Sequence, residues 1–355
     1  MPPKPPTVRR QRAKIEDVAR AVGVHASTVS RVLNPRTAGR VSDAVAKRVR
    51  AAAKRLGYAA DPLASGLRTR RSSMIGVVVP DIANQVFPLI LRGVEAEVAA
   101  AGYTAIVANT DNDPARASEI LDRLAARRVD GVILATATFG DTLAGHCRAL
   151  ALPVVLVNRS VDGDAVSAVV NDDEGGIALA VAHLVGLGHR AIGHVAGPQA
   201  ISTGRGRRTG FAAAMKASGL PAGPWTAAES FDIEAGAHAC ARLLASGRPV
   251  TAIVAANDLL ALGCYDELKR RGLRCPSDLS VTGYNDMAFA DRFDPPLTSV
   301  RIAHRRMGAE AARLLLAEIA DIALPRRRIR LAPELVTRGS TAAPPAGSRR
   351  KRIAV

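Results

Sequence analysis

Several features that would assign this chain to a common class of protein are missing from its sequence. Only 3% of the 355 residues are aromatic, which argues against an extensive stacking platform for single-stranded nucleic acid. The four cysteines, Cys147, Cys240, Cys264 and Cys275, are scattered, without a CxxC pair or a histidine at ligand spacing. We therefore expect reduced, mostly buried thiols, no disulfide framework and no metal site.

Membrane and catalytic signals are also missing. The first residues, MPPKPPTVRRQRAK, lack the apolar core of a signal peptide, and no later apolar run reaches the length of a transmembrane helix. The sequence contains no P-loop, no GxSxG elbow and no HExxH motif. These absences predict a cytoplasmic protein with no membrane partner and no cofactor, and they weigh against an enzyme.

What the sequence does have is positive charge gathered at one end. Residues 1–73 contain seventeen Lys and Arg against four acids, a net charge of +13 out of the total of +17. A basic segment joined to a nearly balanced body indicates a nucleic-acid partner or an anionic membrane. The alternative is a solvated basic tail. We expect residues 1–12 to form a disordered basic tail and residues 343–355 a basic C-terminal tail without leucine heptads.

Residues 13–57 have the apolar periodicity of three short helices. We expect Gly23 to end the first helix and Ser42 to cap the third. The residues expected to face inward are Ile15, Val18, Ala19 and Val22, then Val29, Val32 and Leu33, then Val45, Val49, Ala52 and Leu56. A helix, a turn with glycine and a second helix with small polar and basic residues predict a helix-turn-helix unit that reads double-stranded DNA.

The second helix, 26–33, is the predicted recognition helix. Ala26, Ser27 and Arg31 fall on its outer face, where an arginine can contact guanine through two hydrogen bonds. Thr28 and Ser30 are placed within reach of phosphates, and Asn34 at the end of the motif is assigned to the same interface. An ordinary amphipathic helix pair is the alternative interpretation.

From Met74 onward, short β-rich runs alternate with amphipathic helical stretches. This alternation predicts an α/β region of two similar lobes, each a doubly wound parallel sheet with helices on both faces. The expected strands are 75–81, 103–109, 129–135 and 153–158 in one series, and 166–172, 191–197, 251–258 and 279–286 in a second. In such folds ligands bind at the carboxyl ends of the strands. Those ends carry Asp81, Asn109, Asn158, Asn257 with Asp258, and Asn285 with Asp286.

The segment IEDVARAVGVHASTVSRVLN (15–34), followed by RVSDAVAKRVRAAAKRLGY, resembles the headpiece of the LacI/GalR (lactose-repressor) family. The likeness continues in the family's order through IGVVVPDIANQVF, VDGVILA, PVVLVNR, AANDLLALG, VTGYND and PELVTRGST, and it covers residues 13 to 342. It implies a nucleoid-associated transcriptional regulator, a repressor, that binds a near-palindromic operator as a homodimer. It further implies a periplasmic-binding-protein-like core, residues 73–342, with a small-molecule effector held between its lobes.

Residues 58–72 correspond to the hinge of that family. Asp61 suits an N-cap and Pro62 the first helical position, but the stretch is short and Gly66 weakens it. We expect this helix to form only when two copies pack together on DNA. By resemblance, Leu67 is the side chain that enters the minor groove. A plain basic linker is the alternative.

The same resemblance assigns effector-binding roles to Arg207, Asn158, Asn257, Asn285, Asp81 and Phe87. The guanidinium fork of Arg207 can bind vicinal hydroxyls or a carboxylate. Asp258 and Asp286 either take part or only cap a helix and hold a loop.

Asn158 and Asn285 are amides at positions where family members frequently have acids, while Arg207 remains. Two further arginines are nearby in the sequence: Arg159 directly follows Asn158, and Arg205 lies two positions before Arg207. We hypothesise that the cleft prefers an anionic ligand, such as an organic acid or a sugar phosphate, over a neutral sugar. Two rival classes remain open at this point. A transport-type binding protein shares the core but leaves the first 70 residues unexplained, and an enzyme on a doubly wound scaffold lacks catalytic motifs.

Overall fold

The computed structural model describes residues 13–33, 41–58, 71–140, 142–163 and 165–345. They form two compact units, which divide between Ser72 and Ser73. Across these ranges, no helix combines the length and the apolar character needed to cross a bilayer. The predicted tail 1–12, the predicted hinge helix 61–67 and the last ten residues of the chain lie outside the described residues.

The first unit is a three-helix bundle, as predicted. Its helices are α1 (Ile15–Val22), α2 (Ala26–Leu33) and α3 (Asp43–Leu56). The Asp17 carboxylate accepts a hydrogen bond from the Lys14 backbone N–H at 2.9 Å, which caps the start of α1, and Gly23 ends this helix with a φ of 71°. Arg48 on α3 donates from Nη2 to the carbonyl of Val22 at 2.8 Å, which ties the third helix to the end of the first.

Two details of α3 differ from the prediction. Ser42 occupies the N-cap position, but its side chain makes no capping hydrogen bond, and the helix begins on its carbonyl, which accepts from Ala46. Leu56 is 37% exposed, so it lies outside the bundle core. The buried residues of α3 are Ala46, Val49, Ala52 and Ala53. The small alanine side chains allow the other helices to pack closely, so the buried face of α3 is centred on them and not on Leu56.

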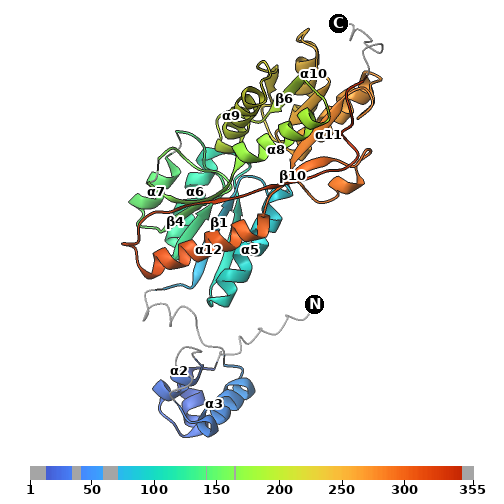
Figure 1. Cartoon of the computed structure of the whole chain (residues 1–355). Helices are drawn as coiled ribbons and strands as arrows, with labels where there is room; N and C mark the ends of the chain where they lie inside the picture. The colour runs from blue at the N-terminus through green and yellow to red at the C-terminus, as the bar shows by residue number, and fades with distance from the viewer. Residues whose placement is uncertain (1–12, 34–40, 59–70, 141, 164, 346–355) are drawn as a thin grey trace, which may run out of the picture. The chain divides into compact units, whose positions relative to one another are not determined.

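The second unit contains two lobes, each built on a six-stranded sheet, and this confirms the predicted pair of doubly wound sheets (Figure 1). In the first lobe all strands are parallel, in the order β11-β5-β4-β3-β1-β2. They are β1 (Met74–Val79), β2 (Thr104–Asn109), β3 (Gly131–Leu134), β4 (Val154–Val157), β5 (Ser167–Asn171) and β11 (Arg328–Leu331). Helices α5 (Val86–Ala100) and α12 (His304–Ala320) cover one face, and α6 (Pro114–Ala126) and α7 (Leu143–Ala149) the other.

The sheet of the second lobe has the order β12-β10-β9-β8-β6-β7, in which only β12 is antiparallel to its neighbour. Its strands are β6 (Ile192–Ala196), β7 (Trp225–Ala227), β8 (Ala252–Ala255), β9 (Ser280–Asn285), β10 (Thr298–Arg301) and β12 (Glu334–Val336). Helices α8 (Asp173–Gly186) and α9 (Ser202–Ala217) pack on one face, and α10 (Ile233–Leu244) and α11 (Asp258–Arg270) on the other. A short 3-10 helix, η2 (Ala290–Arg292), precedes β10.

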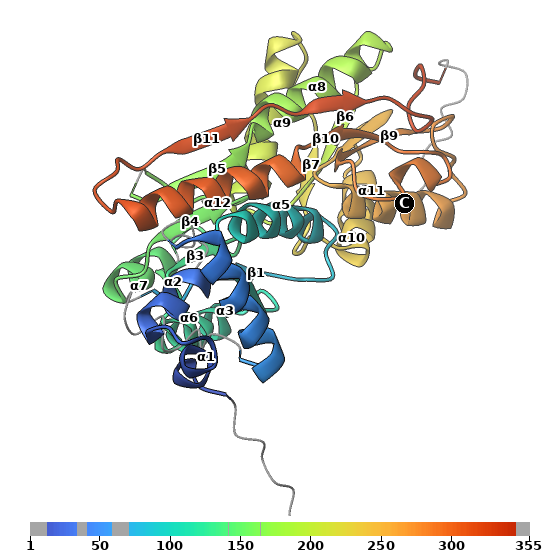
Figure 2. The same ribbon diagram turned by 90° about the horizontal axis from the view of Figure 1, so that it is seen from below.

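The chain passes between the lobes three times, after β5, after β10 and after β11. Figure 2 shows the last of these passages as the extended segment that runs from β11 toward the second lobe, beside α12. A single apolar core continues from α5 and α12 to α8, α9 and the second sheet. The lobes are therefore joined by three chain connections and by a shared apolar core.

One prediction about the sheets was wrong. The strand at 166–172 was expected to open the second series, but β5 pairs with β4 and β11 in the first sheet. Strand–helix alternation gives the order of elements along the chain, whereas the crossing after Asn171 is set by tertiary packing. Sequence analysis also did not predict α7, α10, α12, β7, β10, β11 or β12 as elements.

Candidate functional site

The outer face of α2 carries the residues predicted to contact DNA. Ser27 and Arg31 are exposed, while Ala26, Thr28 and Ser30 are half-buried. The helix is held from behind by Val29 and Val32, which are buried in the bundle core. Asn34 and Leu67, the other two residues predicted to contact DNA, lie outside the described residues.

His25 is a part of this surface that sequence analysis did not identify. It stands at the N-cap of α2, where its carbonyl accepts from the backbone N–H of Thr28 at 2.9 Å. Its ring Nδ1 accepts from the backbone N–H of Ser27 at 3.2 Å and lies 2.8 Å from the Ser27 hydroxyl. An imidazole thus takes the role usually played by a short polar side chain, so His25 fixes the start of the recognition helix.

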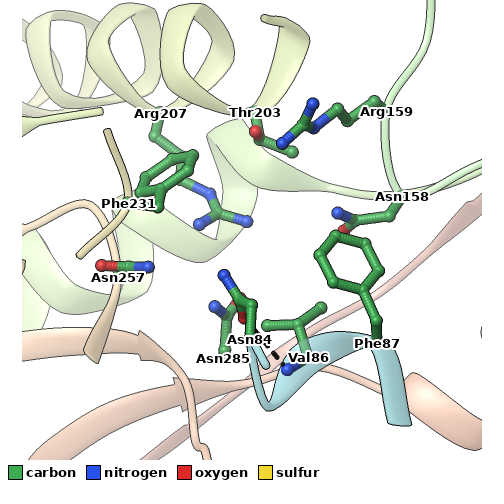
Figure 3. A pocket seen from close by; sticks show the side chains of 10 residues that line it. All are labelled: Asn84, Val86, Phe87, Asn158, Arg159, Thr203, Arg207, Phe231, Asn257 and Asn285. Atoms are coloured by element: carbon green, nitrogen blue, oxygen red, sulfur yellow. Dashed lines mark hydrogen bonds between the residues drawn. The ribbon is translucent and has the colours of Figure 1, made fainter. Parts of the chain in front are cut away.

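A pocket of about 320 Å³, partly open to solvent, lies between the lobes of the second unit (Figure 3). The first lobe contributes residues from the β1–α5 connection, the first turn of α5 and the end of β4. The second lobe contributes residues from α9, the loop after β7 and the ends of β8 and β9. The lining residues are Asn84, Val86, Phe87, Asn158, Arg159, Thr203, Arg207, Phe231, Asn257 and Asn285.

Five of the six residues predicted to bind the effector lie together in this lining: Phe87, Asn158, Arg207, Asn257 and Asn285. The sixth, Asp81, is not among the lining residues. Its carboxylate accepts from the backbone N–H of Ala83 at 2.9 Å and its carbonyl accepts from that of Asn84. Asp81 therefore shapes the turn that carries Asn84 into the pocket. No sequence pattern assigned Asn84, Val86, Thr203 or Phe231 to this site, and Arg159 was counted only toward the positive charge of the cleft.

Arg207 is buried and points toward the centre of the pocket (Figure 3). Its Nε donates to Asp173 Oδ1 at 2.8 Å, and its Nη1 donates to the carbonyl of Ala256 at 2.7 Å. The guanidinium also lies 3.8 Å from the centre of the Tyr284 ring. Within the described chain Nη2 forms no hydrogen bond, so this fixed group presents N–H donors to a ligand.

Four asparagine amides surround the pocket. Asn158 and Asn285 have φ values of 66° and 105°, a left-handed region that asparagine tolerates better than most residues. Their side chains make no hydrogen bond with any residue that the structure describes. The Asn84 and Asn257 oxygens accept from the backbone N–H groups of Val86 and Leu260, which leaves their amide N–H groups for a ligand.

The acidic residues near these strand ends hold the fold together. Asp258 is buried, and it accepts from the Met287 backbone N–H at 2.7 Å and from the Ser299 hydroxyl at 2.5 Å. Burial raises the pKa of Asp258 to about 7. Asp286 pairs with Arg301 and Arg338. Both acids hold loops in place, which was one of the two alternatives left open by the sequence. No cluster that could hold a metal ion is present among the described residues.

Two hydrogen bonds and one stacked pair join the lobes at one side of the pocket. The Phe139 backbone N–H, after β3, donates to the carbonyl of Ala200 at 2.9 Å, and the Ser160 N–H donates to the Ser202 hydroxyl at 2.9 Å. The guanidinium of Arg205, on the second lobe, stacks 3.7 Å from the centre of the Phe139 ring. Arg205 is thus engaged outside the lining, although the sequence hypothesis counted it toward the charge of the cleft.

Comparison with known proteins gives consistent matches for both units. The family "Bacterial regulatory proteins, lacI family" matches residues 14–61, and a periplasmic binding protein-like domain matches residues 181–341. The ribose operon repressor of Escherichia coli (strain K12) is 34% identical over 332 residues, covering 92% of this chain and 99% of that protein.

Solved structures agree with these matches. The transcriptional regulator CelR in complex with cellobiose is similar with a TM-score of 0.71 and 31% identity, over 93% of this chain and 100% of that one. The lac repressor dimer bound to operator and the anti-inducer ONPF has a TM-score of 0.81 at 26% identity, over 94% and 100% of the two chains.

Proposed function

We propose, for a chain that belongs to the lacI family of DNA-binding transcriptional repressors, that a small molecule bound between the two lobes controls its affinity for an operator. One observation carries the proposal. Side chains from both lobes converge on one pocket at the carboxyl ends of the strands, with Arg207 fixed at its centre. A ligand in contact with both lobes binds one relative arrangement of the lobes better than others, which is the requirement for coupling to a second site.

DNA recognition is assigned to the outer face of α2. Ser27 and Arg31 project from it, and Thr28 and Ser30 flank them. We propose that the chain acts as a homodimer on a near-palindromic site; the dimeric, operator-bound lac repressor to which it is similar supports this. In a dimer of this kind the spacing of two half-sites mirrors the two-fold symmetry of the protein.

The first test is sequencing of genomic fragments retained by the purified chain, in parallel with Arg31→Ala and Arg20→Ala variants. Both variants lose one exposed headpiece charge, but Arg20 lies on α1 and Arg31 on α2. We expect one near-palindromic motif to be enriched by the native chain and lost with Arg31→Ala, a change of about 1–3 kcal/mol in discrimination. Arg20→Ala should weaken binding evenly across sequences. Retention without any motif would refute sequence-specific control.

The second test asks whether the pocket controls DNA affinity. Operator affinity is measured by fluorescence anisotropy in the presence of a panel of small metabolites, for the native chain and for Arg207→Gln. A compound that changes native affinity at least fivefold and leaves Arg207→Gln unchanged supports the proposal, since typical coupling is about 1–3 kcal/mol. A compound that acts equally on both proteins acts outside this pocket and argues against it.

A further inference from the structure

The pocket contains a buried cation without a counter-charge. Arg159 follows β4 and is 8% exposed, and its side chain forms no ion pair or hydrogen bond with any described residue. Burial lowers the pKa of its guanidinium to about 10, with no acid acting in the opposite direction. Figure 3 shows this guanidinium beside Thr203, within the lining of the pocket. A buried charge without a partner is strongly unfavourable, so a ligand anion would be stabilised here.

The residues that line the pocket, counted together with Asp173, carry one excess positive charge. Arg159 and Arg207 are the two charged lining residues, and Arg207 is neutralised by Asp173 at 2.8 Å. Arg205 stacks on Phe139 away from the lining. The other lining residues in the list above are neutral amides, a hydroxyl and apolar groups. The uncompensated charge therefore belongs to Arg159.

A second feature of the same wall favours an anion. Thr203 lies in the first turn of α9, a helix of 16 residues whose N-cap, Ile201, has no side chain able to cap it, and whose first turn has no acid. The backbone N–H groups of such a turn lack intrahelical partners and carry partial positive charge. Arg159 and the start of α9 thus favour the same negative group from two sides of the cleft.

The remainder of the lining suits the body of a hydroxylated compound. The amides of Asn84, Asn158, Asn257 and Asn285 offer hydrogen bonds to hydroxyl groups, and the rings of Phe87 and Phe231 offer apolar faces. Amide donors and acceptors beside two aromatic rings can hold a small hydroxylated molecule.

We propose that this cleft binds a small polyhydroxylated monocarboxylate, a sugar acid, and that Arg159 with Thr203 holds its carboxylate. The proposal rests on the proposed function, in which this pocket receives the effector. One carboxylate neutralises the single excess charge, whereas a phosphate monoester, with a charge of about −1.5 to −2, leaves surplus negative charge in the same buried space. A neutral sugar leaves Arg159 unpaired.

The test measures binding of paired probes to the full chain by calorimetry. The pairs are D-gluconate with D-glucitol, D-galacturonate with D-galactose, and D-glucuronate with D-glucose and with glucose 6-phosphate. At least one acid should bind about 10- to 100-fold more tightly than its neutral partner, as expected for a charge-assisted hydrogen bond. A neutral sugar that binds as tightly as its acid, or a phosphate that binds more tightly than the monocarboxylate, would overturn the proposal.

Two variants assign the preference to Arg159. Arg159→Gln should remove the preference for the acid and leave the affinity for the neutral partner within about threefold. Arg205→Gln removes an equal charge on the stacked guanidinium outside the lining, and it should retain the preference. If Arg159→Gln keeps the native ratio of acid to neutral affinity, the carboxylate is bound elsewhere and the proposal is wrong.

One further measurement needs no bound ligand. Because Arg159 is buried without a partner, Arg159→Met should raise the melting temperature of the chain without added ligand. A lower melting temperature would show a stabilising partner and overturn the proposal.

The DNA experiments distinguish a failure of this proposal from a failure of the proposed function. If a neutral sugar changes operator affinity through Arg207, the proposed function holds and only the ligand class is wrong. If no compound changes operator affinity while sugar acids bind, the control mechanism fails instead.

Discussion

The buried ion pair between Arg207 and Asp173 offers a quantitative test of the electrostatics in the cleft. The two side chains are 3% and 12% exposed, and Arg207 also donates to the Ala256 carbonyl. Arg207→Met keeps much of the volume but leaves the Asp173 carboxylate without its cation. We expect the unfolding free energy to fall by about 3–5 kcal/mol, because an uncompensated charge remains buried. For a unit of this size the melting temperature should fall by roughly 6–10 °C.

The same variant has a pH signature with a definite sign. Burial raises the pKa of Asp173, and the Arg207 guanidinium opposes this rise. Without Arg207 the pKa rises further, whereas in the unfolded chain it stays near about 3.9. At a pH between these two pKa values, Asp173 is protonated in the folded variant and ionised in the unfolded chain. The unfolding free energy of Arg207→Met, relative to the native chain, should therefore increase as the pH falls from 7 toward 4.

The assay is urea unfolding of four proteins: the native chain, Arg207→Met, Asp173→Asn and the double variant. The double variant removes both charges, so it should recover at least half of the loss seen in Arg207→Met, with a coupling energy of about 2 kcal/mol or more. If Arg207→Met unfolds within about 1 kcal/mol of the native chain, or if the two single losses simply add, the pair does not carry the energy that we assign to it.

Three further predictions concern other parts of the chain. Burial lowers the pKa of His194 to about 4, so the unfolding free energy should fall as the pH drops from 6.5 to 4. His194→Gln should reduce this fall, measured by urea unfolding at each pH, by up to about 3 kcal/mol. A Cβ at Gly93 would lie 2.0 Å from the Arg305 carbonyl oxygen on α12, so Gly93→Ala should lower the unfolding free energy by about 3 kcal/mol. A Cβ at Gly186 would meet no atom within 4 Å, so the control Gly186→Ala should not lower it. His25→Ala should destabilise α2 by about 1 kcal/mol in thermal unfolding followed by circular dichroism, and His25→Asn should restore it.

The headpiece was predictable because its signals are local. Apolar spacing places Val18, Val29 and Val49 in one core, and Gly23 marks the end of α1. His25 was not predicted because histidine is not a usual N-cap residue, and its Nδ1 accepts from the Ser27 N–H only in the folded structure. The local pattern thus predicts helices well and the chemistry of their ends less well.

The cleft was predictable only in part, for reasons of geometry. Asn158 could be placed because it ends a strand, but Arg159 is directed into the pocket by the tight turn in which its own N–H donates to the Val157 carbonyl at 2.7 Å. Next to Asp172, which caps α8, Asp173 lies in the first turn of that helix. Its role as the partner of Arg207 depends on a residue 34 positions away on another helix, which no local pattern reveals.

The position of the pocket constrains how a ligand can act on the whole chain. The two lobes touch through Phe139 and Ala200 and through Ser160 and Ser202. A ligand shifts the arrangement of the lobes only by its difference in affinity for the two arrangements. A contact confined to one lobe, such as that with Arg207, strengthens binding to both arrangements equally, so it determines how much ligand is bound and not the difference between them. An anion held by Arg159 from the first lobe and the start of α9 from the second is lost when the lobes separate, so in the proposed mechanism this contact carries the coupling energy.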